Sequence, residues 1–217
     1  MNLLQVNAVG VQDRAEFIGK VYTMLGVSLL FCCGGALYGL SMPAILYWPM
    51  FFADLILLFV CMSGLRKSYP LNLMLLFLFT TVSGLMLGFI LEHGYVMRGM
   101  GQLIPMATGI TAVTFGGLSL YVHITKQDFL FIGGALMVGL IGMLLVALVG
   151  SFIHLPISSV MYGGFGVLLF SGFILYDTSN LVRRYNDDEV VAATLALYLD
   201  IVNMFLMVLR LLSGRRQ

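Results

Sequence analysis

The stretch LALYLDIVNMFLMVLRLL, residues 195–212, decides the class of this protein. It is apolar almost throughout, and a helix of about 20 apolar residues crosses the ~30 Å hydrocarbon core of a bilayer. Similar apolar runs recur along the whole chain, in which 60% of the residues are hydrophobic and 10% are charged. Because soluble domains carry about 25% charged residues, the sequence predicts an integral protein of a lipid bilayer.

The apolar runs predict seven transmembrane helices in a single polytopic domain that covers residues 1–217. Long unbroken runs favour helices over the short alternating strands of an outer-membrane barrel. A short segment, 1–20, precedes the spans, and a tail at 213–217 follows them. The expected spans are 21–40, 44–64, 71–91, 103–122, 129–152, 157–178 and 190–212.

Basic residues fall mainly in alternate connections between the spans, which the positive-inside rule assigns to the cytoplasm. They are Arg14, Lys20, Arg66, Lys67, Lys126, Arg183 and Arg184. The N-terminus is therefore expected in the cytoplasm. Seven crossings place the C-terminus outside, whereas Arg210, Arg215 and Arg216 favour the inside. Either the last helix crosses, or the final segment enters the membrane and turns back.

Several function classes are disfavoured by composition and motifs. The formal net charge of +1 gives no support for nucleic-acid binding, which needs a clustered basic face. Cys32, Cys33 and Cys61 all lie in expected spans and are interpreted as reduced packing residues. Gly-x-Gly-Asp, Gly-x-Ser-x-Gly and His-Glu-x-x-His are absent from the sequence, so we do not expect an enzyme.

Two glycine pairs predict close helix packing. Gly35 and Gly39 lie four residues apart in the first span, and Gly84 and Gly88 repeat this spacing in the third. Small residues at this spacing let two helix backbones approach each other in lipid, where burial of apolar surface gives helices no preference for one another.

Three acidic residues, Asp54, Asp177 and Asp200, fall within expected spans. An acid at the centre of a span costs about 3 kcal/mol, so each needs a partner, a proton or water. Asp200 shares one arc of the last helix with Asn203, Met207 and Arg210, and this stripe should face protein.

The sixth and seventh spans both carry Asp-x-x-Asn, with Asn180 following Asp177 and Asn203 following Asp200. An asparagine amide can donate a hydrogen bond to a carboxylate one turn away, so each acid gains a neutral supporting residue. If the two acids meet in a weakly polar site, both cannot ionise cheaply, and one should hold a proton near neutral pH. Alternatively, each acid only ties its helix to a neighbour, for example through Arg66 or Arg210.

Two segments, YDTSN at 176–180 and ALYLDIVNMFLMVLRLL at 196–212, resemble the signature of the Bax inhibitor 1 family, the transmembrane Bax inhibitor motif proteins. A third, YPLNLMLLFLFT at 69–80, resembles the family's third span. The resemblance extends over the seven-span plan and is closest to bacterial-type members. It implies an all-α fold in which six helices surround a central seventh, the C-terminal one.

The resemblance also implies roles for individual residues. Asp177 and Asp200 match the family's buried aspartate pair, and Arg66 matches the arginine that holds this pair closed. Asp54 matches the general position of an acid in the second span, where relatives carry Glu, and is expected as a transient calcium ligand in an ion path. Family members are described as pH-sensitive calcium leak channels, so calcium is expected as the permeating ion, with no cofactor.

Two other functions compete with a calcium leak. Some bacterial members are associated with a membrane-bound AAA protease, which implies a regulator whose acids are structural. A proton-coupled transporter is the third possibility, because buried acids also mark proton relays. In each case the resemblance implies a location in the bacterial inner membrane.

Overall fold

The computed structural model of this chain describes the backbone of residues 3–62, 69–153 and 158–214, and the side chains of 14–62, 71–150 and 158–214. Within these ranges it is helical and contains no strand. Seven helices are long and apolar enough to cross a membrane, which confirms the predicted all-α membrane class. They are α1 (Leu3–Gly39), α2 (Tyr47–Met62), α3 (Tyr69–Leu91), α4 (Leu103–Thr125), α5 (Gly133–Ile153), α6 (Ser159–Arg183) and α7 (Val190–Gly214).

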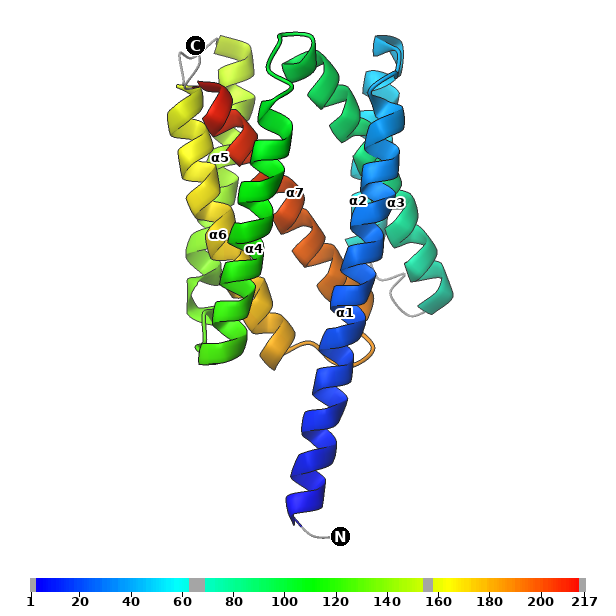
Figure 1. The fold of residues 1–217 in the computed structure, drawn as a ribbon, viewed down its shortest axis with the longest axis vertical. Helices are drawn as coiled ribbons and strands as arrows, with labels where there is room; N and C mark the ends of the chain where they lie inside the picture. The colour runs from blue at the N-terminus through cyan, green and yellow to red at the C-terminus, as the bar shows by residue number, and fades with distance from the viewer. Residues whose placement is uncertain (1–2, 63–68, 154–157, 215–217) are drawn as a thin grey trace. The chain divides into compact units, whose positions relative to one another are not determined.

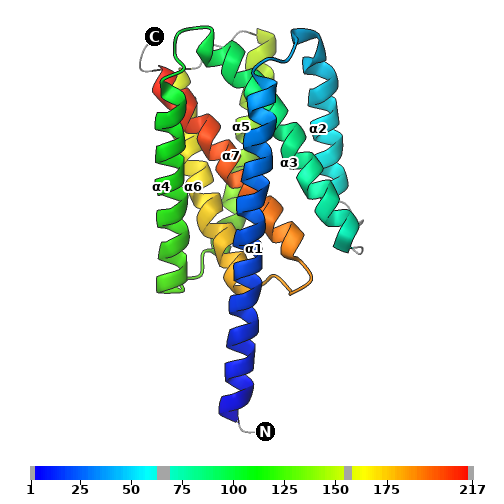
Figure 2. The same cartoon turned by 45° about the vertical axis from the view of Figure 1, so that its right-hand side comes forward.

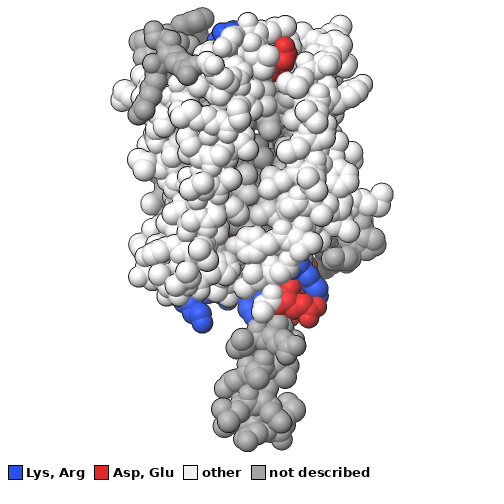
Figure 3. Space-filling view, in the orientation of Figure 1, with Lys and Arg blue, Asp and Glu red and all other residues white. Residues whose placement is uncertain are grey.

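Several helices extend beyond the predicted spans, α1 and α6 by the most residues. Helix α1 begins at Leu3 instead of residue 21, and α6 continues to Arg183 instead of ending at 178. In the first half of α1, Lys20 and Glu16 form an ion pair of 2.7 Å one helical turn apart, so charged residues continue the helix outside the apolar run. Figure 3 shows the coloured charged side chains near the top and bottom of the view, with uncharged side chains between them on that face.

The chain forms two compact units. Unit 1 comprises Met1–Gly101 and Tyr185–Tyr198, and unit 2 comprises Gln102–Arg184 and Leu199–Gln217. Helix α7 contributes its first part to unit 1 and the rest to unit 2. Half of its apolar window is buried, a larger share than in any other of the seven spans.

In unit 1, α1 and α3 pack backbone to backbone through the two predicted glycine pairs (Figure 2). A Cβ added to Gly84 would lie 2.2 Å from the carbonyl oxygen of Cys32, and one added to Gly88 would lie 2.1 Å from that of Ala36. On the opposite helix, Gly35 and Gly39 meet α3 in the same way. The small-residue packing predicted from the sequence is therefore confirmed.

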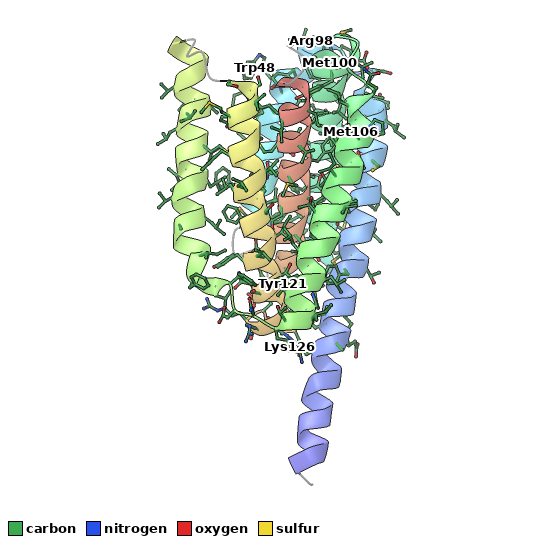
Figure 4. The ribbon with its side chains drawn as sticks, turned by 60° about the vertical axis from the view of Figure 1, so that its left-hand side comes forward. Trp48, Arg98, Met100, Met106, Tyr121 and Lys126 are labelled. Atoms are coloured by element: carbon green, nitrogen blue, oxygen red, sulfur yellow. The ribbon has the colours of Figure 1, made fainter. Side chains whose placement is uncertain are left out.

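In unit 2, α6 packs between neighbours on more than one side (Figure 1). Gly139 of α5 faces Leu169 of α6, and Gly172 of α6 faces Leu136 of α5. Helix α4 contacts α6 as well, and Figure 4 shows Tyr121 and Lys126 at one end of α4 with Met106 toward the other. This packing fixes α6, which carries the first of the two motif aspartates.

Candidate functional site

The predicted polar stripe of α7 faces α6 within unit 2. A Cβ added to Gly166 of α6 would lie 2.4 Å from Cγ of Met207. One turn further along α7, the guanidinium of Arg210 lies over the ring of Tyr162, 4.1 Å from its centroid. The stripe therefore faces protein, as predicted, and its partner is α6.

Asp177 and Asp200 come together at the other end of this helix pair. Asp200 is 4% exposed, Asp177 is half-buried, and the two carboxyl groups lie close enough to interact with each other. Two carboxyl groups this close cannot both ionise cheaply in a weakly polar site, so a proton held between them is favoured. Helix α6 continues to Arg183, so Asp177 lies more than one turn inside the helix instead of at the end of the predicted span.

The two supporting asparagines differ. Asn180 donates from Nδ2 to Oδ1 of Asp177 over 3.2 Å, as predicted. Asn203 donates instead to the carbonyl oxygen of Leu199, over 2.8 Å, so its predicted hydrogen bond to Asp200 is wrong. The reason is local: a carbonyl oxygen one turn back on the same helix lies within reach of the amide. Oδ2 of Asp200 is buried and accepts no hydrogen bond from the side chains and backbone that the structure describes.

Neighbours of Asp177 that the sequence interpretation missed hold the end of α6 in place. The hydroxyl groups of Thr178 and Ser119 lie 3.3 Å apart, both buried. Ser179 accepts a hydrogen bond from the backbone N–H of Phe129 at 3.3 Å, and Arg183 donates to the carbonyl oxygen of Lys126. Thr178 and Ser179 follow Asp177 directly in the motif YDTSN. Their position in the motif is the feature of the sequence that could have identified them.

The remaining predicted site residues lie elsewhere. Asp54 belongs to α2 in unit 1, where Oδ1 is buried without a hydrogen-bond partner among the described groups. Arg66 lies outside the described residues. Arg210 stacks on Tyr162 and forms no ion pair with Asp177 or Asp200 in the described structure. The alternative in which Arg210 ties one of these acids to a neighbouring helix is therefore not found in the described structure.

Three further findings bear on the predictions from the sequence. Within the described ranges, no group of three or more His, Cys, Asp or Glu gathers in a way that could hold a metal ion. Helix α7 is continuous from Val190 to Gly214, which overturns the alternative that the last segment turns back within these residues. The three cysteines are free thiols; Cys32 is buried, as predicted of a packing residue, whereas Cys33 is exposed.

The sequence of this chain is similar to those of known proteins. Residues 14–217 match the family model described as "Inhibitor of apoptosis-promoting Bax1". Bax inhibitor 1 of Schizosaccharomyces pombe is 34% identical over 212 residues, which cover 92% of this chain and 77% of the relative. An uncharacterized protein of Campylobacter jejuni is 35% identical over 209 residues, 93% of this chain and 90% of the relative.

A bacterial relative carries a name that states a role. The Escherichia coli protein "Modulator of FtsH protease YccA" is 35% identical over 165 residues, which cover 73% of this chain and 74% of the relative. These relatives are named as an inhibitor and a modulator, and neither name describes an enzyme.

Proposed function

This chain belongs to the Bax inhibitor 1 family, and from that premise we propose that it is a pH-sensitive calcium leak channel gated by Asp177 and Asp200. The observation that carries the proposal is the meeting of these two carboxyl groups on α6 and α7, one of them 4% exposed. A paired site of this kind holds a negative charge that depends on how many protons it binds. A change in the number of bound protons would change this charge, and with it the contacts that α6 and α7 make around the two acids.

The proposed closed form has one proton shared between the two acids and Arg66 engaged as a latch. Ionisation of both carboxyl groups would set two negative charges against each other in a weakly polar site, and a second proton would remove the charge that Arg66 attracts. Either change alters the balance between two positions of α2. Opening of α2 would give Ca²⁺ a path past Asp54, whose carboxylate is a suitable transient ligand.

Calcium flux into liposomes tests this proposal. The purified protein is reconstituted, and flux is measured at acidic, neutral and alkaline pH with the same pH on both sides. We expect flux that depends on pH in the wild type, and loss of this dependence in Asp177→Asn and in Asp200→Asn. The variant Asp188→Asn, which changes the charge by the same amount at an exposed position, should behave as the wild type.

Two results would contradict the proposal. Flux no greater than that of empty liposomes at every pH would exclude a leak under these conditions. Flux that appears only when a proton gradient is imposed would favour a proton-coupled transporter, because a leak needs a suitable pH but no gradient.

A second candidate is a membrane regulator of an AAA protease, which the name of the YccA relative favours. In that case the two acids serve structure, and their replacement changes stability without changing ion flux. Degradation of a membrane substrate by the purified protease, with and without this protein in the same liposomes, tests it. A degradation rate that this protein leaves unchanged would count against the regulator.

The proposed location is the bacterial inner membrane with the N-terminus in the cytoplasm. The seven apolar spans support a membrane location, and a relative is named "Inner membrane protein YccA". The alternation of Lys and Arg between connections supports the orientation. Reporter fusions to residues 126 and 217 would test it, since they should report the cytoplasm and the opposite side.

A further inference from the structure

The connection between α4 and α5, residues 126–132, is held in shape by its own hydrogen bonds. Oδ1 of Asp128 accepts a hydrogen bond from the backbone N–H of Leu130 over 2.8 Å. The hydroxyl group of Tyr121, near the end of α4, donates to Oε1 of Gln127 over 3.1 Å. The connection therefore presents a defined surface to the end of α6.

The first residue of the connection, Lys126, has a left-handed backbone. Its φ angle is 50°, and among the residues that the structure describes it is the one non-glycine with a positive φ. A residue with a Cβ keeps this strained conformation where its surroundings fix it. The N–H of Lys126 donates to the carbonyl oxygen of Val122 over 2.9 Å, and its carbonyl oxygen accepts from the guanidinium of Arg183. Arg183 thus joins α6 to the strained residue, which Figure 4 shows at the end of α4.

Three residues of α6 meet the connection or the start of α5: Tyr176, Ser179 and Arg183. At about 100° per residue, they lie within an arc of about 60° on the helix. The hydroxyl group of Ser179 donates to the carbonyl oxygen of Gln127 over 3.5 Å and accepts from the N–H of Phe129 over 3.3 Å. One face of α6 is therefore held along about two turns.

Tyr176 packs on Gly133, the first residue of α5. A Cβ added to Gly133 would lie 2.5 Å from Cε2 of Tyr176 and 2.8 Å from its Cζ. The φ angle of Gly133 is −55°, which any residue adopts in a helix, so the glycine is needed for space and not for its backbone freedom. A Cβ added to the next residue, Gly134, would meet nothing within 4 Å. Of the two adjacent glycines, only Gly133 makes room for the ring.

We propose that this contact positions Asp177 for its role in the gate. The connection and Gly133 hold the face of α6 that carries Tyr176, and Asp177 is the next residue, about 100° further round the helix. The buried hydroxyl group of Thr178 meets α4 on another side. A displacement of α6 at the connection would therefore move the Asp177 carboxyl group relative to its neighbours. The role in the gate rests on the proposed function, whereas the positioning of Asp177 does not.

Charged and titratable groups surround this end of α6, so a test must move the helix without altering them. On the described elements packed against it they are His123 and Tyr121 of α4, Lys126 and Asp128 of the connection, and Asp200 of α7; on α6 itself they are Tyr176, Arg183 and Arg184. Gly133→Ala adds one methyl group and leaves every one of these groups in the chain. A changed titration of Asp177 in this variant would therefore report a changed position.

Infrared difference spectra of the protein in nanodiscs test the proposal. In each background the spectrum of the Asp177→Asn variant is subtracted at each pH, which leaves the bands of the Asp177 side chain in its protonated and ionised forms. We expect Gly133→Ala to shift these bands and the pH at which one form replaces the other, because the added methyl group displaces the Tyr176 ring. Gly134→Ala adds the same group one residue along and should leave both unchanged.

A smaller side chain at residue 176 should restore the position. In a Tyr176→Leu background, Gly133→Ala should shift the Asp177 bands less than it does in the wild type, since the ring atoms that the methyl group would meet are gone. Circular dichroism of each variant checks that the helices are retained.

Three outcomes would overturn the proposal: Asp177 bands that Gly133→Ala leaves unchanged, equal shifts with Gly133→Ala and Gly134→Ala, or a shift that persists in full without the Tyr176 ring. The measurement needs neither calcium nor an ion gradient. A shift confined to Gly133→Ala, in a protein without calcium flux, would reject the leak channel and retain the positioning of Asp177.

Discussion

Asn180 donates a hydrogen bond to Oδ1 of Asp177 over 3.2 Å. Asn203, at the equivalent position after Asp200, donates to the backbone of its own helix. Two identical Asp-x-x-Asn patterns thus give different contacts. Only one of the two carboxyl groups has an amide that favours its ionised form.

This asymmetry predicts different effects of two alanine substitutions on the proposed channel. Asn180→Ala removes a donor to the carboxylate, so protonated Asp177 becomes relatively more stable and the midpoint of the pH dependence of flux moves to higher pH. Asn203→Ala should leave this midpoint where it is. Liposome flux measured across the pH range checks both variants, and equal shifts of the midpoint would contradict the assignment.

The contact between α1 and α3 predicts a matched pair of substitutions at adjacent glycines. A Cβ at Gly35 would lie 2.3 Å from the carbonyl oxygen of Thr81, whereas one at Gly34 would meet nothing within 4 Å. Gly35→Ala should lower the free energy of unfolding by about 1–3 kcal/mol because two backbones must separate. Gly34→Ala should have no destabilising effect. Unfolding in mixed micelles gives both values, and equal costs would refute the close approach.

Arg210 and Tyr162 predict a coupling energy between α7 and α6. A cation over an aromatic ring stabilises by about 0.5–2 kcal/mol, so Arg210→Leu should cost more in the wild type than in a Tyr162→Leu background. Tyr162→Phe keeps the ring but loses the hydrogen bond to the carbonyl oxygen of Met143, and it should retain the coupling. A double-mutant cycle with no coupling energy would show that the stacking contributes nothing.

The contact of Ser179 with the connection after α4 predicts a local change in hydrogen exchange. Ser179→Ala removes the acceptor for the N–H of Phe129. Loss of a hydrogen bond worth about 1 kcal/mol should speed exchange of that amide several-fold. Ser171→Ala is the control, since Ser171 bonds to Val167 of its own helix. Unchanged exchange at Phe129 would mean that other contacts hold the connection.

The seven spans and the face of α7 could be predicted because they depend on the sequence of one helix at a time. Apolar length gives each span, and helical periodicity placed Asp200, Met207 and Arg210 on the face that meets α6. The glycine pairs predicted close helix packing, although the sequence did not show that α1 and α3 are each other's partners. The boundaries were less predictable, since charged residues such as Lys20 continue a helix beyond its apolar run.

The contacts that were missed join residues on different helices. Nothing in the chain relates Tyr198 to Thr80, or Tyr162 to Arg210, until packing brings them together. Asn203 is a case within one helix. Its spacing allowed the amide to donate either to Asp200 or to the carbonyl oxygen of Leu199, and in the structure it donates to Leu199. Choices of this kind depend on rotamers and neighbours, which periodicity does not specify.

Infrared spectroscopy of the protein in nanodiscs tests most directly whether Asp177 and Asp200 share a proton that acts as the switch. The spectrum of the double variant Asp177→Asn, Asp200→Asn is subtracted from that of the wild type at each pH. We predict a carbonyl band of a protonated carboxyl group that changes over the same pH range as calcium flux. A difference spectrum without this band at every pH where flux changes would contradict the account.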